Sequence, residues 1–362
     1  MKWFGRKAGR GSARPALARG FGPAFGSGEW PRSYEAQVRD AYAGNPIAQR
    51  AVRLVAESIG SAPLSCSDDA VKRLVTKRSG GQSLIETVAS HMLLHGNAFV
   101  ELLAGADGRA TELFALRPDR VTIEADARGW PGAYLYRVGE MVQRIEPERL
   151  VHIRSFHPTD DHYGLGCLGA AAGAVAIHNA ATRWNKALLD NAARPSGALV
   201  YDGPDGAVLA SDQFDRLKAE LEAHFQGAAN AGRPLLLEGG LRWQAMSLTP
   251  ADMDFVGLKA AAARDIALAF GVPSMLLGLP GDSTYANYRE ANRSLWRLTI
   301  LPLAGKLLGA IAQGLEAGWP GVEIAVDVDR VPELSEDRER LWAMVAGADW
   351  LSVEEKRAAV GL

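Results

Sequence analysis

The segment from Thr249 to Leu315 constrains the fold most, because it predicts two long apolar helices joined by a polar loop. Thr249 before Pro250 places a capping residue ahead of a proline in the first turn, which predicts a helix start. Gly271 and Pro273 predict its end. Apolar residues spaced three and four apart predict one buried face: Met253, Val256, Ala260, Ala263, Ala267 and Phe270.

The second helix of this segment is predicted from about Tyr288 to Leu315. Pro302 lies in its middle, where it removes one backbone hydrogen bond and clashes with the carbonyl of Leu298, so we expect a kink. Its apolar residues again follow helical spacing: Leu295, Leu298, Leu303, Leu307, Ile311 and Leu315. Periodicity alone indicates two ordinary core helices and a loop.

Composition excludes some classes of protein. A chain of 362 residues can form two or three domains. The net charge of -2 gives no general signal for nucleic-acid binding, and two cysteines, Cys66 and Cys167, cannot form a disulfide framework. On this reading the most apolar run is Leu165–Ile177, which is too short to span a bilayer, so we expect no transmembrane helix.

The first thirty residues predict a flexible basic arm, since Glu29 is their only acidic residue. The arm has no apolar segment of the secretory type. Its Arg-rich composition is like that of a mitochondrial transit peptide, but its glycines would interrupt the required helix. A solvated tail is the default interpretation, and contact with a capsid or nucleic acid is the alternative.

Residues 31–166 predict an α+β domain. Asn45 before Pro46 starts one helix, which Gly60 and Pro63 end, and another runs from about Ser83 to His95. The period then changes to two, and turn residues separate the segments. We expect one meandering antiparallel sheet from six strands: Ala98–Leu103, Glu112–Leu116, Val121–Ala125, Tyr134–Val138, Met141–Ile145 and Leu150–Arg154.

A small α/β insertion is predicted between two long helices. The first long helix runs from Leu168 to about Ala192. The insertion contains a strand, an amphipathic helix and a hairpin: Ala198–Tyr201, Ser211–Phe225, and Leu235–Leu237 with Leu241–Met246. After Leu315 we expect a strand at Val322–Val328 and a charged helical tail from Ser335 to Leu362.

The run Gly164–Gly169 matches G-x-G-x-x-G and opens a helix, as a dinucleotide site would. The preceding strand, however, ends near Arg154, too early for a tight strand–turn–helix. Asp190, the acid some twenty residues on, lies in the same helix. The glycines therefore indicate a sharp turn into the helix, with a nucleotide site as the minor alternative.

His152, His157 and His162, with Asp160 and Asp161, form the only polar cluster with metal-ligand residue types. Their spacing matches no helical H-E-x-x-H pair. A surface loop is the better interpretation and a metal site the alternative. We find no convincing catalytic residues, metal site or cofactor site in the sequence.

Several literal strings occur together in one order: Gly96–Glu101, Leu150–Arg154, Gly164–Gly166, Asn191–Gly197, Ala267–Pro273, Leu276–Gly278 and Ser283–Asn287, with Asn292 downstream. In this order they resemble one family, the portal (head-to-tail connector) proteins of long-tailed double-stranded DNA phages and of related gene-transfer particles. The resemblance covers about Pro31 to Leu362. Ser65–Gly81 departs from the family pattern, being short and without an Arg-Pro-Asn element.

The resemblance implies a non-enzymatic ring, usually of twelve subunits, at one capsid vertex of the virion. Its channel would carry double-stranded DNA during packaging and ejection, and it would dock terminase, the head–tail adaptor and the major capsid protein. Assembly would take place in the host cytoplasm, without a membrane. The implied layout is a basic arm (1–30), wing (31–166), stem helix (167–192), clip (193–248), stem helix (249–272), tunnel loop (273–288), kinked wing helix and strand (289–331) and crown (332–362).

The resemblance also implies which residues face DNA. The tunnel-loop residues would be Asp282, Ser283, Thr284, Tyr285 and Asn287, and the candidate channel residues of the stem are Lys259 and Arg264. A low number of basic residues suits a channel for DNA, because each fixed cation that neutralises a phosphate makes the DNA adhere more strongly to the protein. The alternative function is a soluble metal- or nucleotide-dependent enzyme that uses the His152–His162 loop or the Gly164–Gly169 turn.

Overall fold

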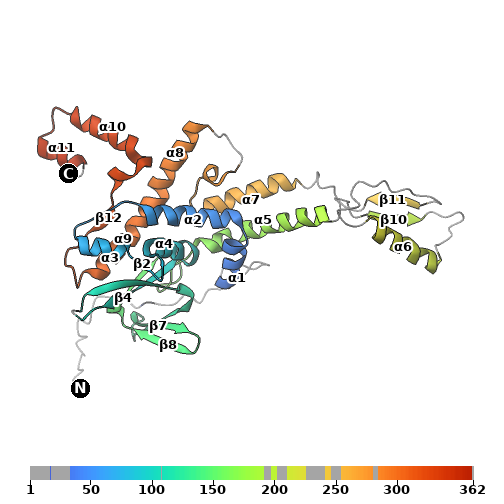
Figure 1. Ribbon diagram of the computed structural model, residues 1–362, viewed down its shortest axis with the longest axis horizontal. Coiled ribbons are helices and arrows are strands. Elements are labelled where there is room, and N and C mark those ends of the chain that lie inside the picture. Colours follow the sequence, from blue (N-terminus) through green and yellow to red (C-terminus); the bar gives the residue numbers. More distant parts are fainter. Residues whose placement is uncertain are drawn as a thin grey trace, which may run out of the picture. The chain divides into compact units, whose positions relative to one another are not determined.

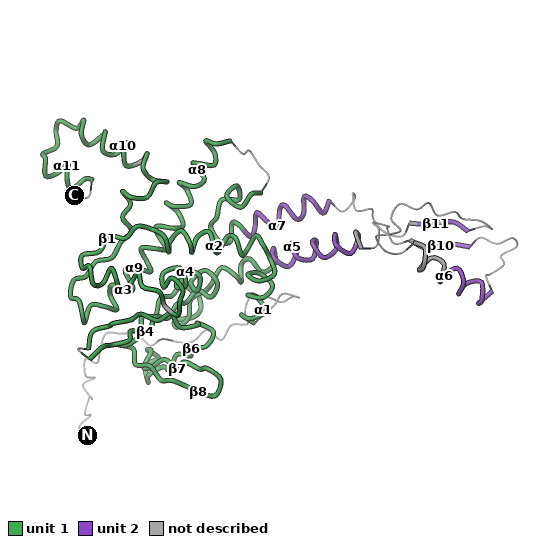
Figure 2. The backbone as a smooth tube through the Cα atoms, in the orientation of Figure 1, with its two compact units in different colours: residues 1–172, 267–362 green, residues 173–266 purple. Residues whose placement is uncertain are grey.

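The structure, a computed structural model, describes residues 17, 33–106, 108–190, 197–201, 210–225, 241–245, 254–279 and 284–360 (Figure 1). The chain forms two compact units (Figure 2). The first unit comprises residues 1–172 and 267–362, and the second comprises residues 173–266. The mixed helix-and-sheet composition predicted from the sequence is confirmed.

The six strands between residues 97 and 154 form two antiparallel three-stranded sheets, so the prediction of one meander is wrong. The last of these strands, Leu150–Arg154, pairs with the first, Asn97–Ala104, with Val100 opposite Val151. It does not pair with the strand that precedes it, Met141–Ile145. One sheet has the order β5-β4-β9 and the other β6-β7-β8. Their bounds are β4 Asn97–Ala104, β5 Ala110–Leu116, β6 Val121–Ala125, β7 Pro131–Val138, β8 Met141–Ile145 and β9 Leu150–Arg154.

Two short 3-10 turns divide the sheets, at Pro118–Arg120 and Pro147–Arg149. Each turn redirects the chain, and the two sheets then share one set of inward-facing side chains. The shared core contains Phe99, Leu116, Val121, Ile123, Tyr134, Ile145 and Leu150. Burial of this common apolar face therefore decides the pairing.

In the described residues ahead of the two three-stranded sheets, the α-helices are α1 Tyr34–Val38, α2 Pro46–Ser61, α3 Asp69–Thr76 and α4 Leu84–His95, with a π-helical turn at Arg39–Ala43. As predicted, Asn45 caps α2, since its Oδ1 accepts hydrogen bonds from the N–H groups of Ile47 and Ala48. Helix α4 packs against α2 and β4. The sequence did not predict β1 (Leu64–Cys66). This strand pairs with β12 (Ile324–Val326), which lies far away in the sequence but belongs to the same unit.

The sequence predicts a kink at Pro302. Ahead of this proline the structure has a π-helical turn, Trp296–Ile300, between α8 (Tyr285–Leu295) and α9 (Leu301–Leu315). The N–H of Leu301 donates to the carbonyl of Trp296, five residues back. This wider turn rotates the helix faces relative to a regular helix. Leu298, predicted to be buried, is therefore 75% exposed, and Trp296 and Ile300 take the buried positions.

The continuous helix Tyr285–Leu315 is long and apolar enough to cross a membrane by length and composition. The sequence-based expectation, which took Leu165–Ile177 as the most apolar run, overlooked it. One such helix is weak evidence, because the core helix of a water-soluble protein passes the same test. Here α9 packs against α4, β9 and β12, and its buried residues are Ala304, Leu307, Leu308, Ile311, Ala312 and Leu315.

The second unit contains most of α5 (Cys167–Asp190) and α7 (Phe255–Ala269), with a two-stranded sheet and α6 (Ser211–Phe225) between them in sequence. β10 (Gly197–Tyr201) pairs antiparallel with β11 (Leu241–Ala245). The predicted strand Leu235–Leu237 lies outside the described residues. The rings of Trp184 and Phe255 stack with centroids 5.9 Å apart.

Helix α7 begins later than predicted. Asp254 precedes it with a φ of 38°, and its side chain accepts a hydrogen bond from the N–H of Gly257. Asp254 is therefore the cap, and the predicted start at Thr249 and Pro250 lies outside the described residues. Val256, predicted to be buried, is 83% exposed.

The C-terminal tail is helical, as predicted, but forms two helices, α10 (Ser335–Ala346) and α11 (Val353–Val360). A short 3-10 turn, Pro332–Leu334, leads into α10. The hydroxyl of Ser335 donates to the carbonyl of Pro332 (2.9 Å), and Leu334 is buried. The hydrogen bond is local to the turn, and the burial of Leu334 packs the start of α10 onto the first unit.

Candidate functional site

The segment between α7 and α8 begins with residues 270–279, which the structure describes. Gly271 ends α7 with a φ of 65°, and its carbonyl accepts a hydrogen bond from the hydroxyl of Thr299 (2.7 Å). Thr299 belongs to the π turn, so this hydrogen bond anchors the end of α7 to that turn. A single 3-10 turn follows, Ser274–Leu277, and ends at Gly278 with a φ of 72°.

Three of the five predicted tunnel-loop residues belong to the start of α8, and Asp282 and Ser283 lie outside the described residues. Thr284 caps the helix, because its Oγ1 accepts a hydrogen bond from the N–H of Asn287 (3.2 Å). The predicted loop, which ran to residue 288, is therefore shorter. Tyr285 is 80% exposed, so it is a surface residue of this chain.

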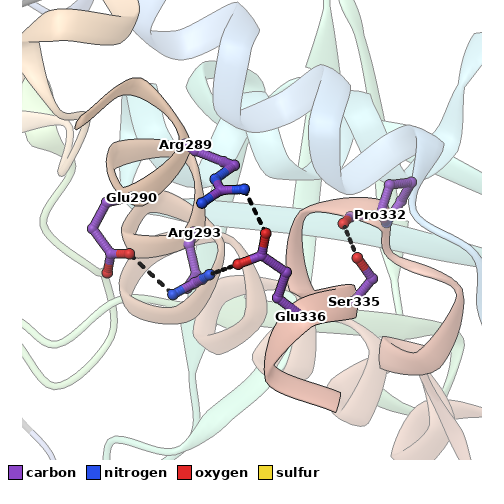
Figure 3. Close-up of polar contacts among 6 residues, drawn as sticks. All are labelled: Arg289, Glu290, Arg293, Pro332, Ser335 and Glu336. Atoms are coloured by element: carbon purple, nitrogen blue, oxygen red, sulfur yellow. Dashed lines mark hydrogen bonds and ion pairs between the residues drawn. The ribbon is translucent and has the colours of Figure 1, made fainter. Parts of the chain in front are cut away.

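Beyond its first turn, α8 contributes three charged side chains, Arg289, Glu290 and Arg293, to a cluster that Glu336 of α10 completes (Figure 3). Arg289 Nη1 lies 2.6 Å from Glu336 Oε1, and Arg293 Nη2 lies 2.8 Å from Glu336 Oε2. Glu290 Oε2 accepts a further bond from Arg293 Nη1 at 3.0 Å. Sequence reasoning missed this cluster. The i, i+4 arginines were visible in the sequence, but their partner on α10 was not.

The two stem candidates have different surroundings. Lys259 is half-buried on α7, and its positive charge acts on His178 of α5. Burial first, and then this charge, lower the pKa of His178. Arg264 is exposed. Within the second unit, Lys259 therefore belongs partly to the packing between the two helices.

The glycines of the G-x-G-x-x-G run provide close backbone packing. A Cβ on Gly164 would lie 2.6 Å from the Ser155 nitrogen, and a Cβ on Gly166 would lie 2.5 Å from the Leu94 carbonyl oxygen. Neither is among the glycines with a positive φ, so the need for glycine here comes from these close backbone contacts. The backbone of residues 94–96 and 155 fills the space where a dinucleotide phosphate would have to approach.

Asn97 links the backbone of Gly164 to the start of β4. Its Oδ1 accepts a hydrogen bond from the N–H of Gly164 (2.7 Å), and its Nδ2 donates to the carbonyl of Gly164 (3.1 Å). His152 Nε2 lies 3.1 Å from the same Oδ1, and its ring stacks on Phe99. We name Gly96, Asn97, Gly164 and Gly166 the glycine joint. It fixes the start of α5 against β4.

The histidines proposed as alternative metal ligands do not converge. His157 is half-buried and accepts a hydrogen bond from the N–H of Thr159, whereas His162 is fully buried. Asp160 Oδ1 accepts from the N–H groups of His162 and Tyr163, which is an Asx turn. No group of three His, Cys, Asp or Glu residues that could hold a metal ion occurs in the described part of the chain.

Three histidines near the joint predict loss of stability in acid. Burial is the main cause that lowers the pKa of His91 to about 4, of His152 to about 3, and of His95 below its usual value. The unfolded chain therefore binds more protons below pH ~6.5, and stability falls from there towards pH ~4. His91 and His152 each contribute on the order of 1.4 kcal/mol per pH unit in that window, and His95 acts in the same direction.

Thermal unfolding between pH 7.5 and 4.5 checks this prediction. The melting temperature should fall steadily with pH, and the variant His91→Met, which removes one titrating group, should show a shallower slope. A melting temperature that is independent of pH in wild type would contradict it.

A comparison of the sequence with known protein families matches residues 46–361 to the phage portal protein family. This chain belongs to the phage portal protein family. An uncharacterized protein of Rickettsia bellii is 40% identical and covers 89% of this chain and 88% of its own length. A probable portal protein of Streptomyces phage phiC31 is 22% identical, covering 85% and 72% respectively.

Solved structures agree with the family. A chain from the neck of an empty GTA (gene transfer agent) particle is 49% identical to this portal chain, with a TM-score of 0.71, and covers 92% of this chain and 94% of its own. An HK97-family phage portal protein from Corynebacterium diphtheriae shares the fold at 16% identity, with a TM-score of 0.61 and coverage of 84% and 99%. The predicted portal fold is confirmed.

Proposed function

We propose that this portal chain forms a closed ring at one capsid vertex, and that the ring conducts double-stranded DNA during packaging and ejection. The observation that carries the proposal is the 49% identity, over 92% of this chain, with a chain from the neck of a native GTA particle computed with C12 symmetry. A heterologous interface that closes on itself produces a cyclic ring. We infer a ring of about twelve subunits by the same likeness.

Within the ring we assign residues 31–166 and 289–331 to the wing, 167–192 and 249–272 to the stem, and 193–248 to the clip. Residues 332–362 form the crown, and the arm 1–30 precedes the wing. The clip meets terminase during packaging and the head–tail adaptor afterwards, and the wing meets the major capsid protein. The ring acts in the virion, after assembly in the host cytoplasm and without a membrane.

The DNA path passes the segment 273–288. Asp282, Ser283, Thr284, Tyr285 and Asn287 are the proposed contacts, with Lys259 and Arg264 in the stem. The high exposure of Tyr285 favours a contact role over a core role. Arg264 is the stronger of the two stem candidates, because Lys259 is half-buried beside His178.

We infer that the portal chain has no catalytic residues, resident metal or cofactor, since the family is a structural one. The alternative enzyme needs an accessible group on the His152–His162 loop or at the Gly164–Gly169 turn. The close backbone packing around Gly164 and Gly166 and the separate surroundings of the three histidines argue against both.

Electron microscopy and light scattering of the purified chain test the proposed function. Closed rings with a central channel are the expected result. A monomer at every protein and salt concentration would refute the ring. Stoichiometric zinc in the wild type, lost in His157→Ala, would favour the enzyme instead.

A further inference from the structure

Helix α8 presents two arginines on one face, directly after the segment proposed to contact DNA. Arg289 and Arg293 lie four residues apart, one helical turn, and both point towards Glu336 of α10 (Figure 3). The guanidinium of Arg289 also lies 5.8 Å from the ring centre of Tyr285. An aromatic ring and two guanidinium groups on one face are a common basis for binding nucleic acid.

The cluster is electrically neutral as it stands. Arg289 and Arg293 carry two positive charges, and Glu290 and Glu336 carry two negative charges. The side chain of Arg293 is only 12% exposed, whereas those of Arg289 and Glu336 are 54% and 38% exposed. Arg293 is thus positioned by its partners, and Arg289 and Glu336 remain accessible to solvent and to a ligand.

Each oxygen of the Glu336 carboxylate binds a different arginine, at 2.6 and 2.8 Å. Two oxygens of one phosphate group can accept from two guanidinium groups in the same way. We propose that Glu336 is a built-in substitute for phosphate, which covers an anion site on α8 and prevents Arg289 and Arg293 from holding the DNA backbone.

This inference rests on the proposed function, because the site matters only if DNA passes α8. In a ring, every subunit contributes the same two arginines, so unpaired arginines would add a phosphate contact for each subunit and slow the sliding of DNA. A contribution of Glu336 to folding is the competing explanation, because the side chain of Arg293 is only 12% exposed and an arginine so buried is destabilising once its partner is removed. The pair with Arg289, which is 54% exposed, adds little stability.

The test measures binding of a fluorescent 20-base-pair DNA duplex to the full-length wild type and to Glu336→Gln, by anisotropy at several salt concentrations. We expect Glu336→Gln to bind about ten-fold more tightly at low salt, with a steeper loss of affinity as salt rises. Glu339→Gln makes the same change of charge at an exposed position of α10 and is expected to match the wild type. In the double variant Glu336→Gln/Arg289→Gln the gain should disappear.

Equal affinity of wild type and Glu336→Gln would overturn the proposal, as would an equal gain in Glu339→Gln, which would indicate a general effect of charge. A gain that persists in the double variant would also overturn it.

Circular dichroism and thermal unfolding of each variant distinguish a specific effect from loss of α10. A Glu336→Gln chain that binds DNA only after unfolding also contradicts the inference. Ring formation is measured separately, so rings without a gain in binding refute only the inference, and a gain without rings refutes only the proposed function.

Discussion

Replacing Gly164 with alanine is expected to destabilise the first unit by at least about 3 kcal/mol. The added Cβ would overlap the carbonyl oxygen of Gly96 and lie 2.6 Å from the nitrogen of Ser155. Both are backbone atoms of neighbouring elements, so no side chain can rotate away to make room. The shift would also stretch the two hydrogen bonds between Gly164 and Asn97.

Gly169→Ala is the matched control, because it lies in the same glycine-rich run but has open space around its Cα. In a helix, alanine is favoured over glycine by about 0.5–1 kcal/mol, so this variant should be as stable as wild type or slightly more stable. Chemical denaturation of the three proteins compares them directly. Similar stability of Gly164→Ala and Gly169→Ala would show that the glycine joint can open at little cost.

Replacing Asp282 with lysine is expected to impair DNA packaging severely while ring formation and thermal stability stay normal. Asp282 lies outside the described residues, and the prediction rests on its sequence position before Thr284, the cap of α8. A lysine there would place a basic ring in the channel, and each subunit would add a phosphate contact. Packaged DNA per particle is the measurement, and the defect should be partly relieved as ionic strength rises.

Asp282→Asn is the control for this experiment, because it removes the negative charge without adding a cation. We expect it to package DNA nearly as well as wild type. If Asp282→Lys also packages normally, residues 279–288 do not line the path of DNA, and the assignment of the channel is wrong.

Local signals in the sequence predicted the individual elements well. Period-two segments bounded by turn residues placed β6, β8 and β9 at their observed bounds, and Asn45-Pro46 and Ser83 marked two helix starts correctly. These signals depend on residues close together in the chain, such as a cap and the N–H groups two or three positions later. The ordered set of family strings identified the portal fold by the same kind of short-range pattern.

The sequence did not predict which elements would meet, because pairing depends on burial summed over distant segments. The return of β9 to β4, the pairing of β1 with β12 and the bonds from Glu336 to α8 all join residues far apart in sequence. One extra residue in the π turn was enough to move Leu298 from the expected core face to the surface.

The sequence by itself determined the bounds of β6, β8 and β9, the capped starts of α2 and α4, and the family, since each depends on residues close together in the chain. Only the tertiary structure decided why Gly164 and Gly166 are glycines, and which carboxylate neutralises Arg289 and Arg293. The physical reason is the same in both cases. Steric exclusion and ion pairing act between atoms a few ångströms apart in space, and folding alone brings those atoms together.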